Sequence, residues 1–325
     1  MNNSYRKQSE KGKKLTVKWI PKSESTCTVF LWQENKGGSM NRKLLFAGLA
    51  ALMLILIWGC EKSPTGTTFD TDEEAITQMM LDNPEGFFSY DDHYGADDTT
   101  TVKDGKAERY TTWWRQILDG GRDITIHIEG DSAYVTFSAW ITGTFHLFVF
   151  DTIPPDTIIH YPKNLGDNFL RWAIFRRGTD LTEYRGWRLE KITGVEVTSD
   201  SNTVDIDSVR IQCVSYPDTV ITDPFVFVDR DNILTFTPGE QVQLTIYVDD
   251  NVYALLHARG RCFGHCHWWR WRFNNVGVGI WTGTWTTPLI PSVRMAAFDI
   301  LHQNTLDDNQ YPYNSNAWIF PYRVE

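Results

Sequence analysis

Cysteine is scarce in this chain. Five cysteines occur in 325 residues, and only Cys213, Cys262 and Cys266 follow position 60. Three cysteines are too few for a framework of disulfide bonds. Aromatic residues make up 14% of the chain and include 14 tryptophans, so large hydrophobic cores can be filled by ring packing.

Several motifs that carry chemistry are also absent from the sequence. It contains no glycine-rich phosphate loop, no G-x-S-x-G nucleophile elbow and no loop in the twelve-residue EF-hand order. The acidic clusters at 229–232, 249–250 and 307–308 are therefore interpreted as solvated turns, not as calcium sites.

Basic charge is in the minority. The chain has 31 Lys and Arg against 41 Asp and Glu, and the part after position 59 has a net charge of −17. A surface of this sign repels nucleic acid and anionic lipid and favours solubility. No nucleic-acid partner is predicted.

A basic and apolar segment stands at 40–60. Arg42 and Lys43 are followed by the uncharged run Leu44–Trp58, and then by Gly59 and Cys60. A basic start, a short apolar core and a small residue before the cut are typical of a secretory signal peptide. The run of 15 residues is shorter than the roughly 20 that span a bilayer. An uncleaved membrane helix remains the alternative.

The four residues Ile57-Trp58-Gly59-Cys60 resemble the lipobox of bacterial lipoproteins. The resemblance implies cleavage before Cys60, a diacylglycerol on its thiol and an acyl group on the new amine. Two or three acyl chains suffice for stable membrane anchoring. The implied location is the bacterial cell envelope, and Glu61, in place of an aspartate, favours the outer membrane. Apart from this covalent lipid on Cys60, no cofactor is predicted.

The chain is divided by composition into five parts. Residues 1–39 are interpreted as a non-native or disordered leader, since Met40 begins the signal peptide at 40–59. Residues 60–69 contain Ser, Thr, Pro and Gly and form a flexible tether. Two folded domains are predicted, at 70–199 and 204–325.

The first domain opens with helix signals. Thr71 or Asp72 can cap a helix that ends at Asn83-Pro84. A later helix is predicted over 107–118, because Tyr110, Trp113, Trp114 and Ile117 share a stripe at helical spacing.

Strands follow these helices. They are predicted at 123–128, 132–150, 169–176 and 187–198, with a tight hairpin turn at 129–131 and a kink or bulge at Gly143. Three prolines predict a loop at 151–167.

Two stretches of this domain resemble the NTF2-like superfamily. They are DITIHIEGDSAYVTF at 123–137, and the run 171–177 followed by GWRL at 186–189. The resemblance implies an α+β domain whose helices pack into the concave side of a bent antiparallel sheet and enclose a cone-shaped pocket. The residues that would line the pocket are Tyr110, Trp113, Trp114, His127, Tyr134, Trp140 and Trp172.

We favour a core role for these aromatic residues over a pocket role. An NTF2-like enzyme needs a carboxylate or an Asp–His pair for proton transfer. Asp123 and His127 share one strand face but lie about 13 Å apart by strand rise, which is too far for a hydrogen bond. No acid–base constellation is visible, and an isomerase or dehydratase is kept as the alternative.

The second domain is predicted to be a β-sandwich. Short alternating segments recur with turn signals every 8–12 residues. The stretch TPGEQVQLTIYVDD at 237–250 resembles Ig-like domains of bacterial surface proteins. The predicted fold class is thus an NTF2-like α+β domain followed by an all-β, Ig-like sandwich.

One hairpin, at 254–272, gathers ligand-type residues. They are His257, Cys262, His265, Cys266 and His267. A Cys262–Cys266 disulfide, free thiols and a zinc or copper site all remain open, since the C-x3-C spacing matches no strong zinc signature. In the following WWRWR strand, alternation predicts Trp269 and Trp271 on one face, and Trp268, Arg270 and Arg272 on the other.

Together these observations predict a lipid-anchored envelope protein with a non-catalytic binding or structural role. Its membrane contact is the lipid, and its candidate partners are envelope proteins or glycans. Glycan binding through exposed aromatic side chains is a further alternative.

Overall fold

The structure is a computed structural model that describes residues 13–18, 69–89, 102–103, 109–151, 157–248, 251–259 and 268–325. Strands make up 62% of the described residues and form two antiparallel sheets, while helices make up 9%. The fold is therefore all-β. The prediction of an NTF2-like α+β domain followed by an Ig-like domain was wrong.

The described elements comprise few helices and many strands. The helices are α2 (Asp72–Asp82), α3 (Gln303–Asp307) and the 3-10 turn η4 (Tyr184–Gly186). The strands are β1 (Lys13–Lys18), β2 (Val102–Lys103), β3 (Arg109–Glu129), β4 (Ser132–Asp151), β5 (Thr157–Arg177), β6 (Trp187–Ile192), β7 (Val195–Ser199), β8 (Ile206–Gln212), β9 (Thr219–Ile221), β10 (Val228–Asp229), β11 (Leu234–Phe236), β12 (Gln241–Val248), β13 (Val252–Arg259), β14 (Trp268–Arg272), β15 (Asn274–Gly277), β16 (Ile280–Thr286), β17 (Ser292–His302) and β18 (Ser315–Val324).

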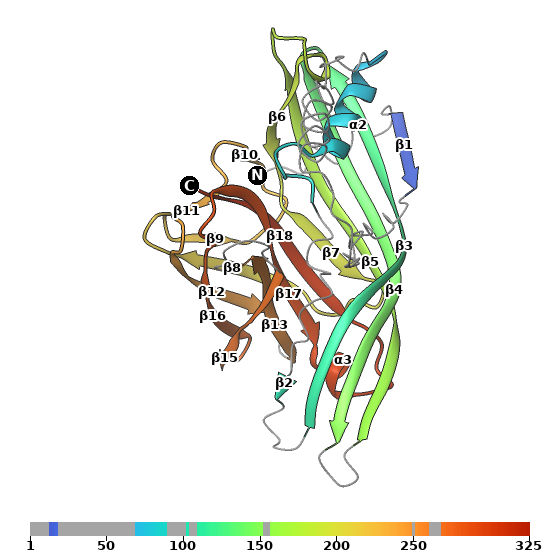
Figure 1. Ribbon diagram of the computed structural model, residues 1–325, viewed down its shortest axis with the longest axis vertical. Coiled ribbons are helices and arrows are strands. Elements are labelled where there is room, and N and C mark those ends of the chain that lie inside the picture. The colour runs from blue at the N-terminus through green and yellow to red at the C-terminus, as the bar shows by residue number, and fades with distance from the viewer. Residues whose placement is uncertain are drawn as a thin grey trace, which may run out of the picture. The chain divides into compact units, whose positions relative to one another are not determined.

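The larger sheet follows the order β1-β3-β4-β5-β7-β18-β17-β13-β14 (Figure 1). The strands β2, β6, β10 and β11 pair at its margins, and β11 runs parallel to β18. The smaller sheet has the order β15-β16-β12-β8-β9. Because β7 pairs with both β5 and β18, one sheet runs through both predicted domains. The domain boundaries themselves stay a prediction.

Three strands of the larger sheet are unusually long. β3, β4 and β5 contain 21, 20 and 21 residues, or about 70 Å at roughly 3.3 Å per residue. They lie side by side and bend together (Figure 1). The register of β3 against β4 shifts between Ile117 and Asp119, so Leu118 is the extra residue of a bulge. It lies beside Gly143, the predicted site of a kink or bulge, but on the partner strand.

The predicted helix at 107–118 is instead part of β3. Trp113 and Arg115 are buried on one face of the strand, while Trp114 and Gln116 lie on the other. The stripe that matched a helix therefore mixes both faces of a strand. Long-range pairing with β4 decided between the two conformations, as tertiary context does when a local pattern fits both.

The predicted loop at 151–167 is also largely strand. β5 begins at Thr157 and pairs with β4 through Pro162. On its other edge, β5 pairs with β7 only from Asp167 onward. Pro162 thus occupies a stretch with pairing on one edge among the described strands, where a residue lacking an N–H is tolerated.

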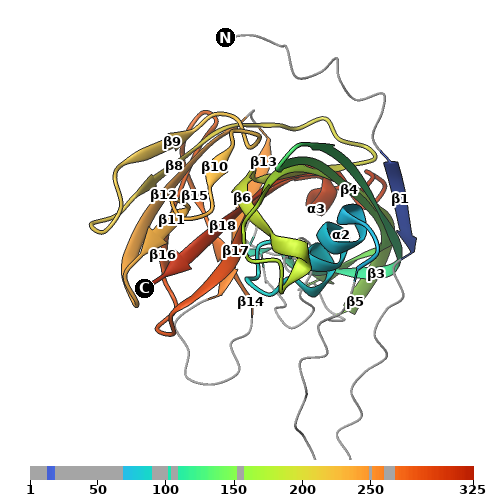
Figure 2. The ribbon, with the colours of Figure 1, turned by 90° about the horizontal axis from the view of Figure 1, so that it is seen from above.

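The predicted N-terminal helix is confirmed as α2. Thr71 and Glu74 form a capping box at its start. Its buried face is Ala75, Ile76, Met79 and Met80, and the curled sheet surrounds it (Figure 2).

The second half packs two sheets face to face, which agrees with the coarse expectation of a β-sandwich. β8, β12 and β16 share a hydrophobic core with β13, β17 and β18. In β12, the apolar residues Val242, Leu244 and Ile246 alternate along the strand and are buried in this core. Trp285 packs edge-on against Tyr322, with ring centroids 5.0 Å apart.

We expect Gly143→Ala to destabilise the protein by about 1–3 kcal/mol, because overpacking displaces backbone. A Cβ atom at Gly143 would lie 1.9 Å from the carbonyl oxygen of Gln116. The measurement is the urea unfolding midpoint. Gly277→Ala is the matched control, because its Cβ would meet its nearest atom at 3.8 Å. Equal midpoints for the two variants would contradict the argument.

Candidate functional site

Ionisable side chains gather on the inner face of the larger sheet. Arg115 points inward from β3, His257 from β13, Arg270 from β14 and Asp299 from β17. β13 lies between β14 and β17, and His257 is paired with Arg270 across the strands. The sheet order therefore brings together residues that are far apart in the sequence.

Asp299 lies at the centre of this cluster. Arg115 donates to it through two nitrogens, with Nη1 at 2.6 Å from Oδ2 and Nη2 at 3.0 Å from Oδ1. The Nε2 atom of His257 lies 2.8 Å from Oδ2. The side chains of Arg115, Asp299 and His257 are 1%, 0% and 2% exposed. The planar guanidinium matches the carboxylate in a two-pronged contact, the stronger form of ion pair.

Tyr313 extends the cluster to β5. Its hydroxyl accepts from Nε of Arg115 at 2.9 Å and from Oγ of Ser315 at 2.6 Å. It donates to Oδ2 of Asp167 at 3.0 Å. The cluster thus contains two aspartates, Asp167 and Asp299, and two arginines, Arg115 and Arg270. Their formal charges balance when His257 is neutral.

Arg270 is held by an aromatic ring. Its guanidinium carbon lies 3.9 Å from the ring centroid of Trp113, and Nη1 donates to the carbonyl oxygen of Trp113 at 2.8 Å. Among aromatic side chains, the indole ring of tryptophan attracts a cation over its face most strongly. The contact ties β14 to β3.

The buried setting shifts the pKa values within this cluster. Burial alone would raise the pKa of Asp299, but the charge of Arg115 and the contact with His257 hold it well below its usual range. Burial lowers the pKa of His257 to about 4, although Asp299 acts in the opposite direction. Burial also raises the pKa of Tyr313 well above its ordinary value. At neutral pH the cluster therefore contains an ionised aspartate and a neutral histidine.

A His–Asp pair is the orienting half of many acid–base sites, but the base must also reach its substrate. His257 and Asp299 are both enclosed by protein atoms, so their geometry is that of an internal brace between strands. The cluster holds β3, β5, β13, β14 and β17 in a fixed relation.

Two other buried cations secure helical segments. Nζ of Lys163 donates to the carbonyl oxygens of Thr305 and Asp308, at 2.6 and 2.8 Å, and burial lowers its pKa to about 8. Arg171 donates to the carbonyl oxygens of Phe87 and Thr193, at 2.6 and 2.8 Å, and burial lowers its pKa to about 9. These contacts fix α3 and the turn after α2 to the sheet.

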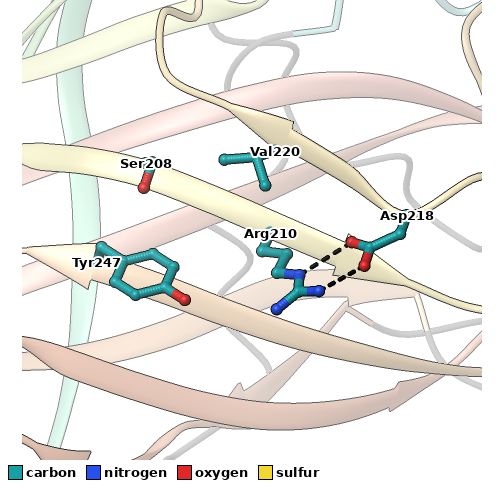
Figure 3. A pocket seen from close by; sticks show the side chains of 5 residues that line it. All are labelled: Ser208, Arg210, Asp218, Val220 and Tyr247. Atoms are coloured by element: carbon teal, nitrogen blue, oxygen red, sulfur yellow. Dashed lines mark hydrogen bonds and ion pairs between the residues drawn. The ribbon is translucent and has the colours of Figure 1, made fainter.

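A shallow hollow of about 510 Å³ lies on the smaller sheet (Figure 3). It is lined by Ser208, Arg210, Asp218, Val220 and Tyr247. Arg210 donates to both carboxylate oxygens of Asp218, at 2.9 and 2.5 Å. The guanidinium already has an acidic partner, so the hollow presents little uncompensated charge to a ligand.

The structure separates the residues that the sequence grouped as pocket candidates. Trp113 lies buried beside Arg270. The five others with described side chains lie on the opposite face of β3, β4 and β5: Trp114, His127, Tyr134, Trp140 and Trp172.

The five residues on that outward face are spread along it. Trp114 stacks on His146, His127 lies 2.8 Å from Glu129, and Trp172 packs against Phe225. Tyr134 and Trp140 are 39% and 40% exposed.

Other predicted sites lie outside the described part of the chain. They are the lipidation site Cys60, the side chain of Tyr110, the candidate disulfide Cys262–Cys266, and the candidate metal ligands His265 and His267. His257, the described member of that metal set, faces Asp299. Within the described residues, no group of three or more His, Cys, Asp or Glu is placed to hold a metal ion.

The predicted faces of the WWRWR strand agree with the structure where its side chains are described. Arg270 faces Trp113, while Trp271 packs against the sandwich core. The side chain of Trp268, the candidate for sugar stacking, lies outside the described residues.

Sequence reasoning missed Arg115, Asp167, Asp299 and Tyr313. None of them belongs to a local motif that marks a site. The available signal was a charge at an inward position, as at Asp299 within the apolar run 295–301.

The chain was compared with protein-family models, with curated proteins and with solved structures, and none of them matches it. Across the described residues, none of the helices has the length and apolar character needed to cross a bilayer.

We expect Asp299→Asn to destabilise the protein by about 3–5 kcal/mol, because removing one partner leaves buried arginine charge uncompensated. Urea unfolding at pH 7 measures this loss. Asp218→Asn is the control, since it breaks a two-pronged Arg–Asp pair of the same type at an exposed position and should barely shift the midpoint. Similar shifts for both variants would show that Asp299 does not brace the core.

His257 predicts a specific pH dependence of stability. Its folded pKa of about 4 lies below the usual 6.5, so between these values the unfolded chain binds a proton that the folded chain does not. The free energy of unfolding should therefore fall as pH drops from about 6.5 to about 4, by up to about 1.4 kcal/mol per pH unit. Its contribution is fully present above about pH 6.5.

The variant His257→Gln should lose this contribution while keeping that of the other histidines. His146 and His302 also have lowered pKa values and remain in both proteins. Urea unfolding of both proteins between pH 7 and pH 4.5 isolates the difference. Parallel stability curves would exclude His257 as the titrating group.

Proposed function

We propose that this protein is a lipid-anchored protein of the bacterial cell envelope with a non-catalytic binding or structural role. Cys60 is the proposed attachment point, and residues 60–69 are the tether. The outer membrane is the proposed location. Residues 70 onward then form a water-exposed β-rich body.

The anchoring proposal is supported by the sequence around Cys60. The basic pair Arg42 and Lys43, the uncharged run 44–58 and the small residue Gly59 precede it in the order of a lipoprotein signal. A lipid anchor also suits the net charge of −17 after position 59, because an acidic body is repelled by anionic headgroups and needs another means of attachment.

The non-catalytic role is supported above all by the position of the Arg115–Asp299–His257 cluster. These groups have the chemistry of an acid–base site, but they contact one another and are at most 2% exposed. Their contacts connect β3 in the first half of the chain with β13 and β17 in the second half. The cluster therefore contributes to a rigid body, as a binding or scaffolding protein requires.

The outward face of β3, β4 and β5 is the proposed contact surface. Tyr134 and Trp140 are 39% and 40% exposed on it, and Trp114 stacks with Phe148 at 4.7 Å. Aromatic side chains of this kind are enriched at protein interfaces. The partners proposed for it are other envelope proteins.

Cleavage before Cys60 would also alter one sheet edge. β1 pairs with residues 121–126 of β3 and precedes the proposed cut. Among the described strands, its removal leaves β3 with an unpaired edge over these residues, and such an edge can accept another strand.

We expect the Cys60→Ser variant to leave the membrane fraction when the gene is expressed in a Gram-negative bacterium. Two or more acyl chains supply the membrane affinity, and serine cannot carry the thioether. Mass spectrometry of the detergent-extracted wild-type protein should show an N-terminal, acylated Cys60. Cys213→Ser is the control and should stay in the membrane fraction. An unacylated, soluble wild-type protein would contradict the proposal.

A further inference from the structure

A pair of histidines lies on the outward face of the long strands. His146 belongs to β4 and His160 to β5. His146 is paired with Pro162 across the strands, and Phe148 is paired with His160, so the two histidines are diagonal neighbours on one face. His160 is exposed and His146 is half-buried.

The two imidazole rings point their nitrogens at each other. Nδ1 of His146 lies 2.8 Å from Nε2 of His160, and the ring centroids are 5.0 Å apart. On the other side of His146, Nε2 lies 2.8 Å from Oε1 of Gln116. A carbonyl oxygen only accepts, so Nε2 of His146 carries the hydrogen and Nδ1 presents a lone pair to His160.

This separation is close to that of two ligands of one metal ion. Transition metals bind imidazole nitrogen at about 2.0–2.1 Å, so angles of 90–110° at the metal place the nitrogens about 2.9–3.4 Å apart. For both nitrogens to bind one ion, the hydrogen that Nε2 of His160 donates to His146 must move to Nδ1 of His160, which gives the other neutral tautomer of that ring. Each nitrogen then offers a lone pair to the ion. The contact from Gln116 is the outer partner that metal-bound histidines use to fix ring orientation and tautomer.

The rings are also held in place before any ion binds. His146 stacks on Trp114 with centroids 5.0 Å apart, and His160 stacks on Phe148 with centroids 4.4 Å apart. Burial, and then the neighbouring His160, lower the pKa of His146, which favours the neutral form that binds metals. Stacking and neutrality both reduce the free-energy cost of assembling the site.

We propose that His146 and His160 form a binding site for a divalent transition-metal ion, with Gln116 as the positioning residue. Imidazole ligands suit Cu²⁺, Ni²⁺ and Zn²⁺, and the expected order of affinity places Cu²⁺ first. Water completes the coordination, because the described neighbours supply two protein nitrogens. The site is independent of lipid anchoring and of the proposed envelope role.

The test uses the full-length protein in detergent, without a polyhistidine tag and with its thiols alkylated, titrated with CuCl₂ at pH 7.5. Electron paramagnetic resonance should show Cu²⁺ coupled to two imidazole nitrogens. The double variant His146→Ala/His160→Ala should bind one equivalent fewer and lose this signal. Each single variant should lose the two-nitrogen pattern.

Two further variants distinguish Cu²⁺ binding at the preorganised His146–His160 site from Cu²⁺ binding by any surface histidine. His127→Ala removes another half-exposed histidine of the same face and should leave binding unchanged. Gln116→Ala should weaken Cu²⁺ binding by roughly 10–100-fold, the usual effect of removing an outer partner. Equal binding by the wild-type protein and the double variant would overturn the proposal, and so would a wild-type spectrum without paired imidazole nitrogens. Either result would leave the histidines as a hydrogen-bonded pair.

Discussion

The contact between Arg115 and Asp299 is the constraint on which the rest of the fold depends. These residues are 184 positions apart, yet two hydrogen bonds of 2.6 and 3.0 Å join them in the interior. Desolvating both ions is costly, and a hydrophobic pair of equal volume is often as stable. What the ion pair adds is specificity, because any shift between β3 and β17 would bury unpaired charge. His257 and Tyr313 reinforce the same arrangement.

The larger sheet changes character along its strands. Around Arg115 its inner face is polar and closed by hydrogen bonds, whereas near α2 it is lined by apolar side chains such as Ile124 and Ile126. β13, β17 and β18 use their other face for the sandwich core. Strands that are buried on both faces have near-continuous apolar sequences, as in residues 317–322 of β18. One sheet thus serves two cores.

The outward face of the long strands has a different composition. Rings stack along it from Trp114 through His146 to His160. A sheet with one face on the core usually presents polar side chains to water. Here Trp114, Phe148 and Trp140 stand among them, which is why this face carries both the proposed contact surface and the proposed metal site.

The sequence by itself determined those features that depend on neighbouring residues. The N-terminal cap of α2 at Thr71 and the turn at 129–131 are local patterns, and the structure confirms them. The lipoprotein-like segment ending at Cys60 is equally local, and it stays a prediction. The secondary structure of residues 107–118 could not be predicted from local spacing, because the same aromatic pattern fits a helix and both faces of a strand.

Tertiary structure alone decided which strands pair and which charges meet. Nothing near Asp299 in the sequence points to Arg115, and nothing near His146 points to His160. A side-chain pattern specifies which face of a strand is buried, but not which distant strand lies beside it. The NTF2-like expectation failed for this reason: the hairpin at 123–137 is present, but β7 and β18 continue its sheet into the second half of the chain.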